Sequence, residues 1–235
     1  YTLWHTLSLH DALPISALLF GSTGAVGKEV LDTLLRDSGY DKVIAFSRRV
    51  IPHEDPKLEI IMDSLEDLDA LAGKIHGDEL YCCLGTTSRK AGSRENFEKV
   101  DLHMPTDLAR LAYENKMTGF IAISSIGAGK MGRGFYLDTK TRMEQAVKQY
   151  PLRKNVVVRP SLIKGQRDEF RFGEEAGKAI DTLFGWAMVG KAEKYRGIHT
   201  QTLARAMVGI MNIDHPEAVY ESDELQRIGR EYNHR

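Results

Sequence analysis

Short apolar runs alternate along the chain with segments that place apolar residues at helical spacing. The runs cover residues 16–20, 42–46, 58–62, 79–84, 119–123 and 155–159. Helical spacing is found at about 28–36, 65–75, 95–115, 135–149, 177–189 and 202–211. Apolar runs of this length suit strands that are buried on both faces. The alternation predicts an α/β fold in which helices cover both faces of a doubly wound parallel sheet.

Residues 16–235 are expected to form one domain, because 235 residues bury about 70% of the unfolded surface in a single core. We expect residues 160–200 to be a small insertion on the substrate side. Residues 1–15 do not fit this fold. His5, His10 and Asp11 interrupt their apolar residues, which excludes a secretory signal. Because residues 8–16 read like translated cloning or adapter DNA, we interpret residues 1–15 as a non-native leader.

A glycine-rich turn joins the first predicted strand to the first predicted helix. Glycines in this context let the backbone approach a pyrophosphate, and the amino end of the helix stabilises its negative charge. The ligand implied by this turn is a dinucleotide. The residues predicted to contact it are Gly21, Ser22, Thr23, Gly24, Ala25, Val26 and Gly27.

The ends of the second and third strands carry the next candidate cofactor contacts. Ser47, Arg48 and Arg49 follow the second strand without an acidic residue. Arginine at this place pairs with the 2′-phosphate of NADP, whereas a carboxylate accepts the 2′-hydroxyl of NAD. The sequence therefore favours NADP(H), with a solvated arginine turn as the alternative. Asp63 ends the third strand, where it could accept an adenine amino group or cap the next helix.

Small and polar residues follow the fourth strand, where the cofactor ribose and pyrophosphate would pass. Leu84, Gly85 and Thr86 are the predicted contacts here, and Pro160 is the predicted contact after the sixth strand. Pro105 lies inside the helix predicted at 95–115 and is expected to bend it.

Tyr136 and Lys140 stand four residues apart on the helix predicted after the fifth strand, hence on one face. Met143 and Val147 extend the same stripe, which makes this face the buried one. A phenol and an ammonium group on a buried face are costly unless the protein uses them. Tyr150 and Lys154 have the same spacing, but Pro151 keeps them off a common helix face.

The composition narrows the class of protein. Acidic residues number 33 and basic residues 32, which argues against a nucleic-acid-binding or membrane-surface protein. No apolar run approaches the roughly 18 residues of a membrane span. Cys82 and Cys83 are adjacent and lack metal-ligand spacing, so we expect two buried core residues. We therefore predict a cytoplasmic protein with a small-molecule ligand and no metal site.

The chain resembles the short-chain dehydrogenase/reductase superfamily in four motifs and in their order. These are the glycine turn, the serine pair Ser124 and Ser125, the Tyr136–Lys140 pair and RPS at 159–161. Within this superfamily, four stretches resemble the atypical, Tat-interacting-protein-like oxidoreductases. They are YCCLGTT at 81–87, KVDL at 99–102, FYLDTK at 135–140 and RPSLI at 159–163. The resemblance implies a nucleotide-binding domain of the Rossmann type.

The resemblance also implies a Ser-Tyr-Lys site that reduces a small-molecule carbonyl with NADPH. Tyr136 would donate the proton, and Tyr136 and Lys140 would contact the cofactor. Lys140 would hold the nicotinamide ribose and favour the phenolate, since a nearby cation lowers the pKa of a phenol from about 10. Ser125, or else Ser124, would bind the substrate oxygen.

Two other functions stay open at this stage. One is a regulatory protein that binds NADP(H) and a protein partner, or a second copy of itself, with little catalysis. The other is an enzyme resembling a nucleotide-sugar epimerase or reductase, although the region after the sixth strand is short for that substrate.

Overall fold

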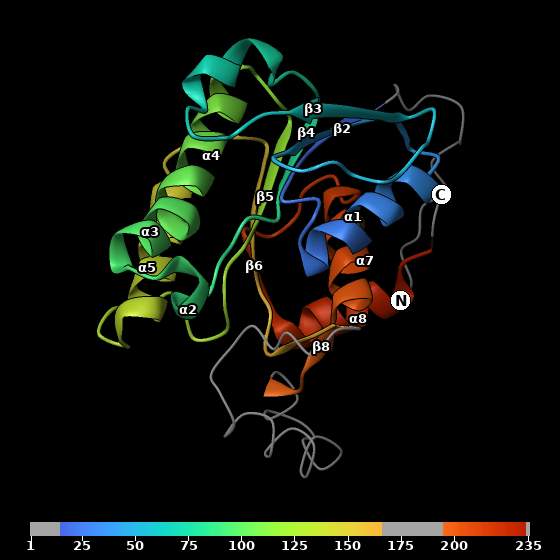
Figure 1. Cartoon of the computed structure of the whole chain (residues 1–235). Coiled ribbons are helices and arrows are strands. Elements are labelled where there is room, and N and C mark those ends of the chain that lie inside the picture. The colour runs from blue at the N-terminus through green and yellow to red at the C-terminus, as the bar shows by residue number, and fades with distance from the viewer. Residues whose placement is uncertain (1–14, 166–194, 234–235) are drawn as a thin grey trace.

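Seven parallel strands form one sheet in the computed structural model, which describes residues 15–165 and 195–233 (Figure 1). The strands are β1 (Ile15–Phe20), β2 (Tyr40–Ser47), β3 (Leu58–Met62), β4 (Glu79–Cys82), β5 (Gly119–Ile123), β6 (Lys154–Arg159) and β9 (Val219–Glu221). Their order is β3-β2-β1-β4-β5-β6-β9, and every pairing is parallel. This confirms the predicted doubly wound sheet. The strand order reverses between β1 and β4, which is where such sheets bind nucleotides.

Helices cover both faces of the sheet (Figure 1). One layer contains α1 (Ala25–Arg36), α7 (Thr200–Met211) and α8 (Ser222–Glu231). The other contains α4 (Met104–Glu114) and α5 (Phe135–Val147), with the short helices α2 (Ser88–Ala91) and α3 (Arg94–Glu98) beside them. Each layer packs on its own cluster of buried apolar side chains. The buried strands thus have apolar residues on both faces, as their continuous apolar runs predicted.

Two predicted helices were wrong in their extent. The segment expected to be helical at 65–75 contains only η1 (Asp69–Lys74), a 3₁₀ helix. Leu65 adopts a left-handed φ of 59°, which interrupts a helix at that point. The helix expected at 95–115 is divided into α3, the π-helical turn η2 (Lys99–His103) and α4. Pro105 lacks an N–H and cannot donate to the carbonyl of Asp101 in an α-helical pattern, so the chain widens into a π-turn before it.

The C-terminal part adds elements that the apolar pattern did not reveal. β9 has three residues, too few for a recognisable run, and it pairs with β6 at the edge of the sheet. A second, two-stranded sheet joins β7 (Ile163–Lys164) to β8 (Ile198–His199). It holds together the two ends of the expected insertion, whereas the helix predicted at 177–189 lies outside the described residues. Ile15, expected to belong to the leader, is the first residue of β1.

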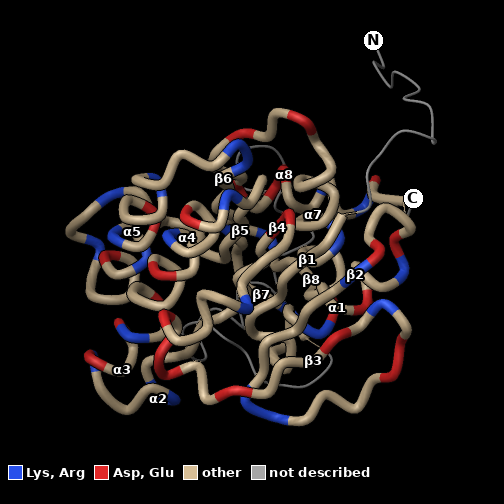
Figure 2. Tube along the Cα trace, turned by 90° about the horizontal axis from the view of Figure 1, so that it is seen from above, with Lys and Arg blue, Asp and Glu red and all other residues tan. Residues whose placement is uncertain are grey.

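Charged residues of both signs are interspersed over the described helices and loops (Figure 2). Within residues 15–165 and 195–233, no helix combines the length and apolar character needed to cross a membrane.

Candidate active site

The glycine turn follows β1 at the carboxyl edge of the sheet. Gly21 has φ of +88°, and a Cβ added there would lie 2.6 Å from the carbonyl oxygen of Cys83. A Cβ on Gly27 would overlap the carbonyl oxygen of Gly21. Only glycine therefore lets the turn pack against the chain after β4 and against the first turn of α1. Gly24 is the N-cap of α1 and has no side chain to occupy the first N–H groups of that helix.

Ser22 lies inside this turn and is 1% exposed. Its hydroxyl has no hydrogen-bond partner among the described residues. Buried hydroxyl groups normally have a partner, so the turn has hydrogen-bonding capacity that the chain itself leaves unused. The uncapped helix end and the Ser22 hydroxyl fit the polar phosphates of a dinucleotide.

The arginine turn after β2 is fixed by Ser47. The Ser47 hydroxyl donates to the carbonyl oxygen of Arg49 at 2.7 Å, and the Arg49 N–H contacts the same hydroxyl at 3.1 Å. Arg48 and Arg49 are both exposed. The backbone of the turn is thus ordered while both guanidinium groups face solvent at the carboxyl edge. Asp63 accepts from the Leu65 N–H at 2.8 Å, so it caps the local turn and not a helix, since η1 begins only at Asp69.

Lys140 is the centre of a buried polar cluster. Its side chain is 4% exposed, and its ammonium nitrogen lies 2.7 Å from Oδ1 of Asp101. The same ammonium donates to the carbonyl oxygen of Ile123, at the end of β5, at 3.1 Å. An ammonium group has three N–H donors, and these are its two partners among the described residues. One donor is therefore left to reach a ligand such as a ribose hydroxyl.

Tyr136 lies one turn before Lys140 on α5 and is half-buried. Its ring packs at 5.6 Å, centroid to centroid, against the buried ring of Phe97 on α3. The predicted stripe is confirmed for Met143 and Val147, which are both buried. Tyr150, by contrast, lies in the turn after α5, and Lys154 begins β6, so that pair shares no helix face.

The two serines after β5 have different surroundings. The Ser124 hydroxyl donates to Oε1 of Glu144 on α5 at 2.6 Å. Among the described residues, the Ser125 hydroxyl makes one long contact of 3.4 Å, to the carbonyl oxygen of Ile126. The Ser124 hydroxyl therefore has a short hydrogen bond to a buried carboxylate, whereas the Ser125 hydroxyl has the weaker contact of the two.

Sequence reasoning assigned no role to four charged residues of this region, Asp101, Glu144, Arg159 and Glu221. Glu144 accepts from Arg159 through Nε at 2.9 Å and Nη2 at 2.6 Å, and Arg159 also donates to Glu221 at 2.9 Å. Asp101 accepts from the Thr86 N–H at 2.8 Å in addition to pairing with Lys140. The KVDL stretch followed by Pro105 was the sequence feature that could have pointed to Asp101. It was not used, because a charged residue on a predicted helix is usually solvent-exposed.

The remaining predicted contacts lie at the same edge of the sheet, because parallel strands all end there. Leu84, Gly85 and Thr86 follow β4 and are half-buried, and Pro160 follows β6 and is buried. Cys82 and Cys83 are buried on opposite faces of the sheet, as expected. Burial raises the pKa of the Cys82 thiol to about 12, so this cysteine is not a nucleophile at neutral pH.

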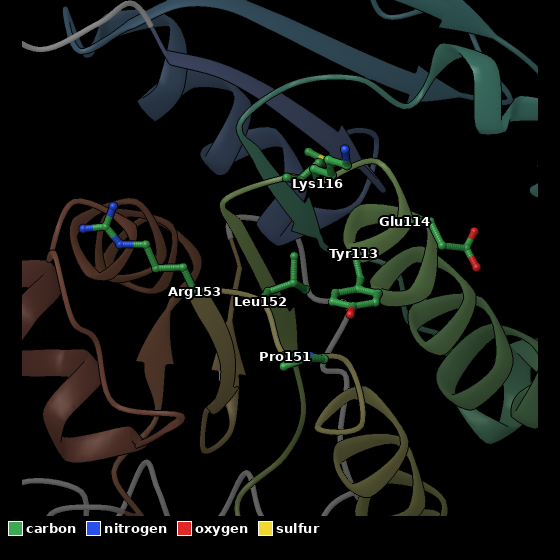
Figure 3. Close-up of a pocket in the computed structure, with 7 residues that line it drawn as sticks. Tyr113, Glu114, Lys116, Pro151, Leu152 and Arg153 are labelled. Carbon is green, nitrogen blue, oxygen red and sulfur yellow. The ribbon is translucent and has the colours of Figure 1, made fainter.

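A surface hollow of about 400 Å³ lies at the other end of the sheet, between the end of α4 and the turn before β6 (Figure 3). Tyr113, Pro151 and Leu152 form its apolar part, while Glu114 and Arg153 point away to opposite sides. It is separated from the glycine turn by the length of the strands and contains none of the predicted site residues.

Comparison with known proteins decides the family. A family model described as NAD(P)H-binding matches residues 21–212, which include the glycine turn and the Tyr136–Lys140 pair. The chain belongs to this NAD(P)H-binding family. The expected dinucleotide ligand is thereby confirmed as NAD(P)H, without a distinction between NADP and NAD.

Curated relatives support the same assignment. Protein FMP52, mitochondrial, from Chaetomium globosum is 30% identical over 232 residues, covering 92% of this chain and 97% of that protein. Protein HTATIP2 from Rattus norvegicus is 32% identical over 197 residues, covering 82% of this chain and 79% of that protein. The resemblance to the atypical short-chain dehydrogenases/reductases is thus confirmed. The prediction of a cytoplasmic protein was wrong, because several relatives are named as mitochondrial and neither the charge balance nor the cysteines carry an organelle address.

Solved structures share the fold of the NAD(P)H-binding domain. UDP-N-acetylglucosamine 4-epimerase from Methanobrevibacter ruminantium M1 matches with a TM-score of 0.66 and 15% identity, covering 91% of this chain and 80% of that one. The oxidoreductase ylbE from Lactococcus lactis matches with a TM-score of 0.60 and 16% identity, covering 94% and 100%. At this identity the likeness establishes the fold alone.

Proposed function

We propose that this protein is an NADPH-dependent oxidoreductase that reduces a carbonyl group, with Ser125, Tyr136 and Lys140 as its catalytic residues. The observation that carries the proposal is the burial of Lys140 on α5, one helical turn from Tyr136. A buried ammonium is costly to desolvate, and Lys140 retains one N–H donor beside the ends of β4 and β5. Membership of the NAD(P)H-binding family supplies the cofactor class.

Each residue has a distinct role in this proposal. The Tyr136 phenol donates a proton to the substrate oxygen as negative charge develops there, which is general acid catalysis. The Ser125 hydroxyl donates a hydrogen bond to the same oxygen and lowers the cost of that charge. Lys140 would hold the nicotinamide ribose through its third N–H. The nicotinamide, when bound, supplies the hydride.

Cofactor contacts are assigned by their place at the carboxyl edge of the sheet. The glycine turn with Ser22 and the first turn of α1 would hold the pyrophosphate. Arg48 and Arg49 would pair with the 2′-phosphate, which is the reason for preferring NADPH over NADH. Asp63 would accept a hydrogen bond from the adenine amino group. The ribose and pyrophosphate would pass along Leu84, Gly85 and Thr86, and Pro160 would contact the cofactor after β6.

Two measurements test the proposal in sequence. Titrations of NADPH and NADH, followed by cofactor fluorescence, should show that NADPH binds more tightly, and tighter binding of NADH would contradict the NADP assignment. NADPH consumption is then measured with a panel of aldehydes and ketones. A protein that binds NADPH but reduces no member of a broad panel would contradict the oxidoreductase proposal.

A further inference from the structure

Asp101 joins the candidate catalytic lysine to the end of a neighbouring strand. One carboxylate oxygen lies 2.7 Å from the Lys140 ammonium, and the other accepts from the Thr86 N–H at 2.8 Å. The carboxylate therefore has both oxygens engaged, one with α5 and one with the chain after β4. The side chain of Asp101 is 2% exposed, so both contacts are shielded from solvent.

The position of Asp101 depends on the π-helical turn. η2 runs from Lys99 to His103, between α3 and α4, and π-turns inside helices occur frequently at functional sites. Pro105 prevents an α-helical hydrogen bond to the carbonyl of residue 101. The widened turn carries a carboxylate on the buried side of a helical segment, where a regular amphipathic helix would place an apolar residue.

Among the described residues, the other charged groups near the pair have partners of their own. Glu144, one turn after Lys140 on α5, is bonded to Arg159 and Ser124. The Cys82 thiol lies close enough to interact with both Lys140 and Asp101, but its raised pKa of about 12 keeps it neutral. From α3, the Arg94 guanidinium stacks 5.0 Å from the ring centroid of Phe135, next to Tyr136. Glu98 on the same helix is paired with Arg142 at 2.6 Å. Asp101 is thus the carboxylate that balances the Lys140 ammonium among the described residues.

We propose that Asp101 is a positioning residue for the reaction, which holds the Lys140 ammonium beside Thr86 and offsets its positive charge at the Tyr136 phenol. This inference rests on the proposed function, because it assigns Tyr136 as the proton donor. The charge balance keeps the phenol protonated, which carbonyl reduction requires. Without the carboxylate, an uncompensated ammonium one helical turn away would favour the phenolate.

The test is the Asp101→Asn variant, which keeps the shape of the side chain and a carbonyl oxygen for Thr86 but removes the charge. In the direction of carbonyl reduction, the alkaline limb of the kcat/KM profile should move to lower pH by about one unit. Asp101→Glu retains the charge, so its alkaline limb should stay with that of the unmodified protein even if its turnover is lower. Asp107→Asn removes a half-buried carboxylate from α4 and should leave the limb in place.

A second readout does not need turnover. The ultraviolet difference spectrum between each protein and its Tyr136→Phe counterpart isolates the titration of this phenol, and Asp101→Asn should lower its midpoint in the same direction. Asp101→Ser removes the same charge, and it replaces Asp101→Asn in both measurements if the Asn variant does not fold. An unchanged phenol titration and an unchanged alkaline limb would overturn the inference. A different outcome is that the unmodified protein reduces no carbonyl while Asp101→Asn still lowers the midpoint of the phenol titration. That outcome would overturn the proposed function but not the charge balance between Asp101 and Lys140.

Discussion

The Ser124 hydroxyl donates to Oε1 of Glu144 at 2.6 Å, which distinguishes it from the hydroxyl of the adjacent Ser125. Ser124 joins a buried network in which Glu144 also binds Arg159. The Ser125 hydroxyl has no charged partner within residues 15–165 and 195–233, and Ser125 is the serine that we assign to the substrate oxygen.

Replacing the two serines separately should show that Ser124 affects the stability of the fold and Ser125 affects the rate of catalysis. Ser124→Ala removes a hydrogen bond to a buried carboxylate and should lower the free energy of unfolding by about 1 to 3 kcal/mol, measured by urea denaturation. Ser125→Ala should lower kcat about 100-fold, as expected for one donor to a developing oxyanion, with little change in unfolding. The opposite distribution of effects would assign the substrate contact to Ser124.

Tyr136→Phe should separate binding from catalysis. The variant keeps the ring contact with Phe97 and loses only the hydroxyl, so NADPH should still bind while kcat falls by about 10² to 10⁴. Tyr150→Phe is the matched control, because Tyr150 lies in the turn after α5 and should have a near-normal rate. Carbonyl reduction at an unchanged rate in Tyr136→Phe would remove this residue from the mechanism.

The arginine turn should set the preference between the two cofactors. Replacing Arg48 and Arg49 together by Ala should weaken NADPH binding by about 1 to 3 kcal/mol, because charge-assisted contacts to the 2′-phosphate are lost. NADH lacks that phosphate, so its dissociation constant should change little. Arg36→Ala removes an exposed arginine at the far end of α1 and provides the control. Equal losses for both cofactors would indicate a general electrostatic effect.

A buried network at the amino ends of the strands should make stability depend on Lys154. Oε2 of Glu79 accepts from Tyr40 at 2.7 Å and Tyr81 at 3.1 Å, while Lys154 contacts Oε1 at 3.2 Å and also binds the carbonyl oxygen of Met211. Burial raises the pKa of Glu79 above 4.5, against the lowering effect of Lys154. Lys154→Met should cost about 3 to 5 kcal/mol at neutral pH, because it leaves the carboxylate without its cation.

The sign of the pH dependence follows from the raised pKa. The folded protein binds a proton at Glu79 more readily than the unfolded chain, so the destabilisation is absent below about pH 4.5 and grows as pH rises through the folded-state pKa. The deficit of Lys154→Met, measured by urea denaturation, should therefore shrink towards low pH. Adding Glu79→Gln to this variant should recover part of the stability and abolish the pH dependence. A deficit that is the same at all pH values would indicate lost packing and not an unpaired charge.

The sequence by itself determined the elements whose signal is local. Six of the seven strands of the main sheet follow apolar runs, since a strand buried on both faces must be apolar throughout. The glycine turn was recognisable because a close backbone approach excludes any side chain at Gly21 and Gly27. The stripe of α5, with Lys140, Met143 and Val147 buried, follows from helical spacing alone.

Only the tertiary structure decided which polar groups meet. The partner of Lys140 comes from a π-turn that a regular helical pattern does not predict, and Ser124 is distinguished from Ser125 by Glu144, twenty positions away. β9 is too short to have a pattern and is a strand because β6 offers it an edge. Such contacts depend on where distant segments are brought together, since a buried charge is stable only beside the partner that the fold supplies.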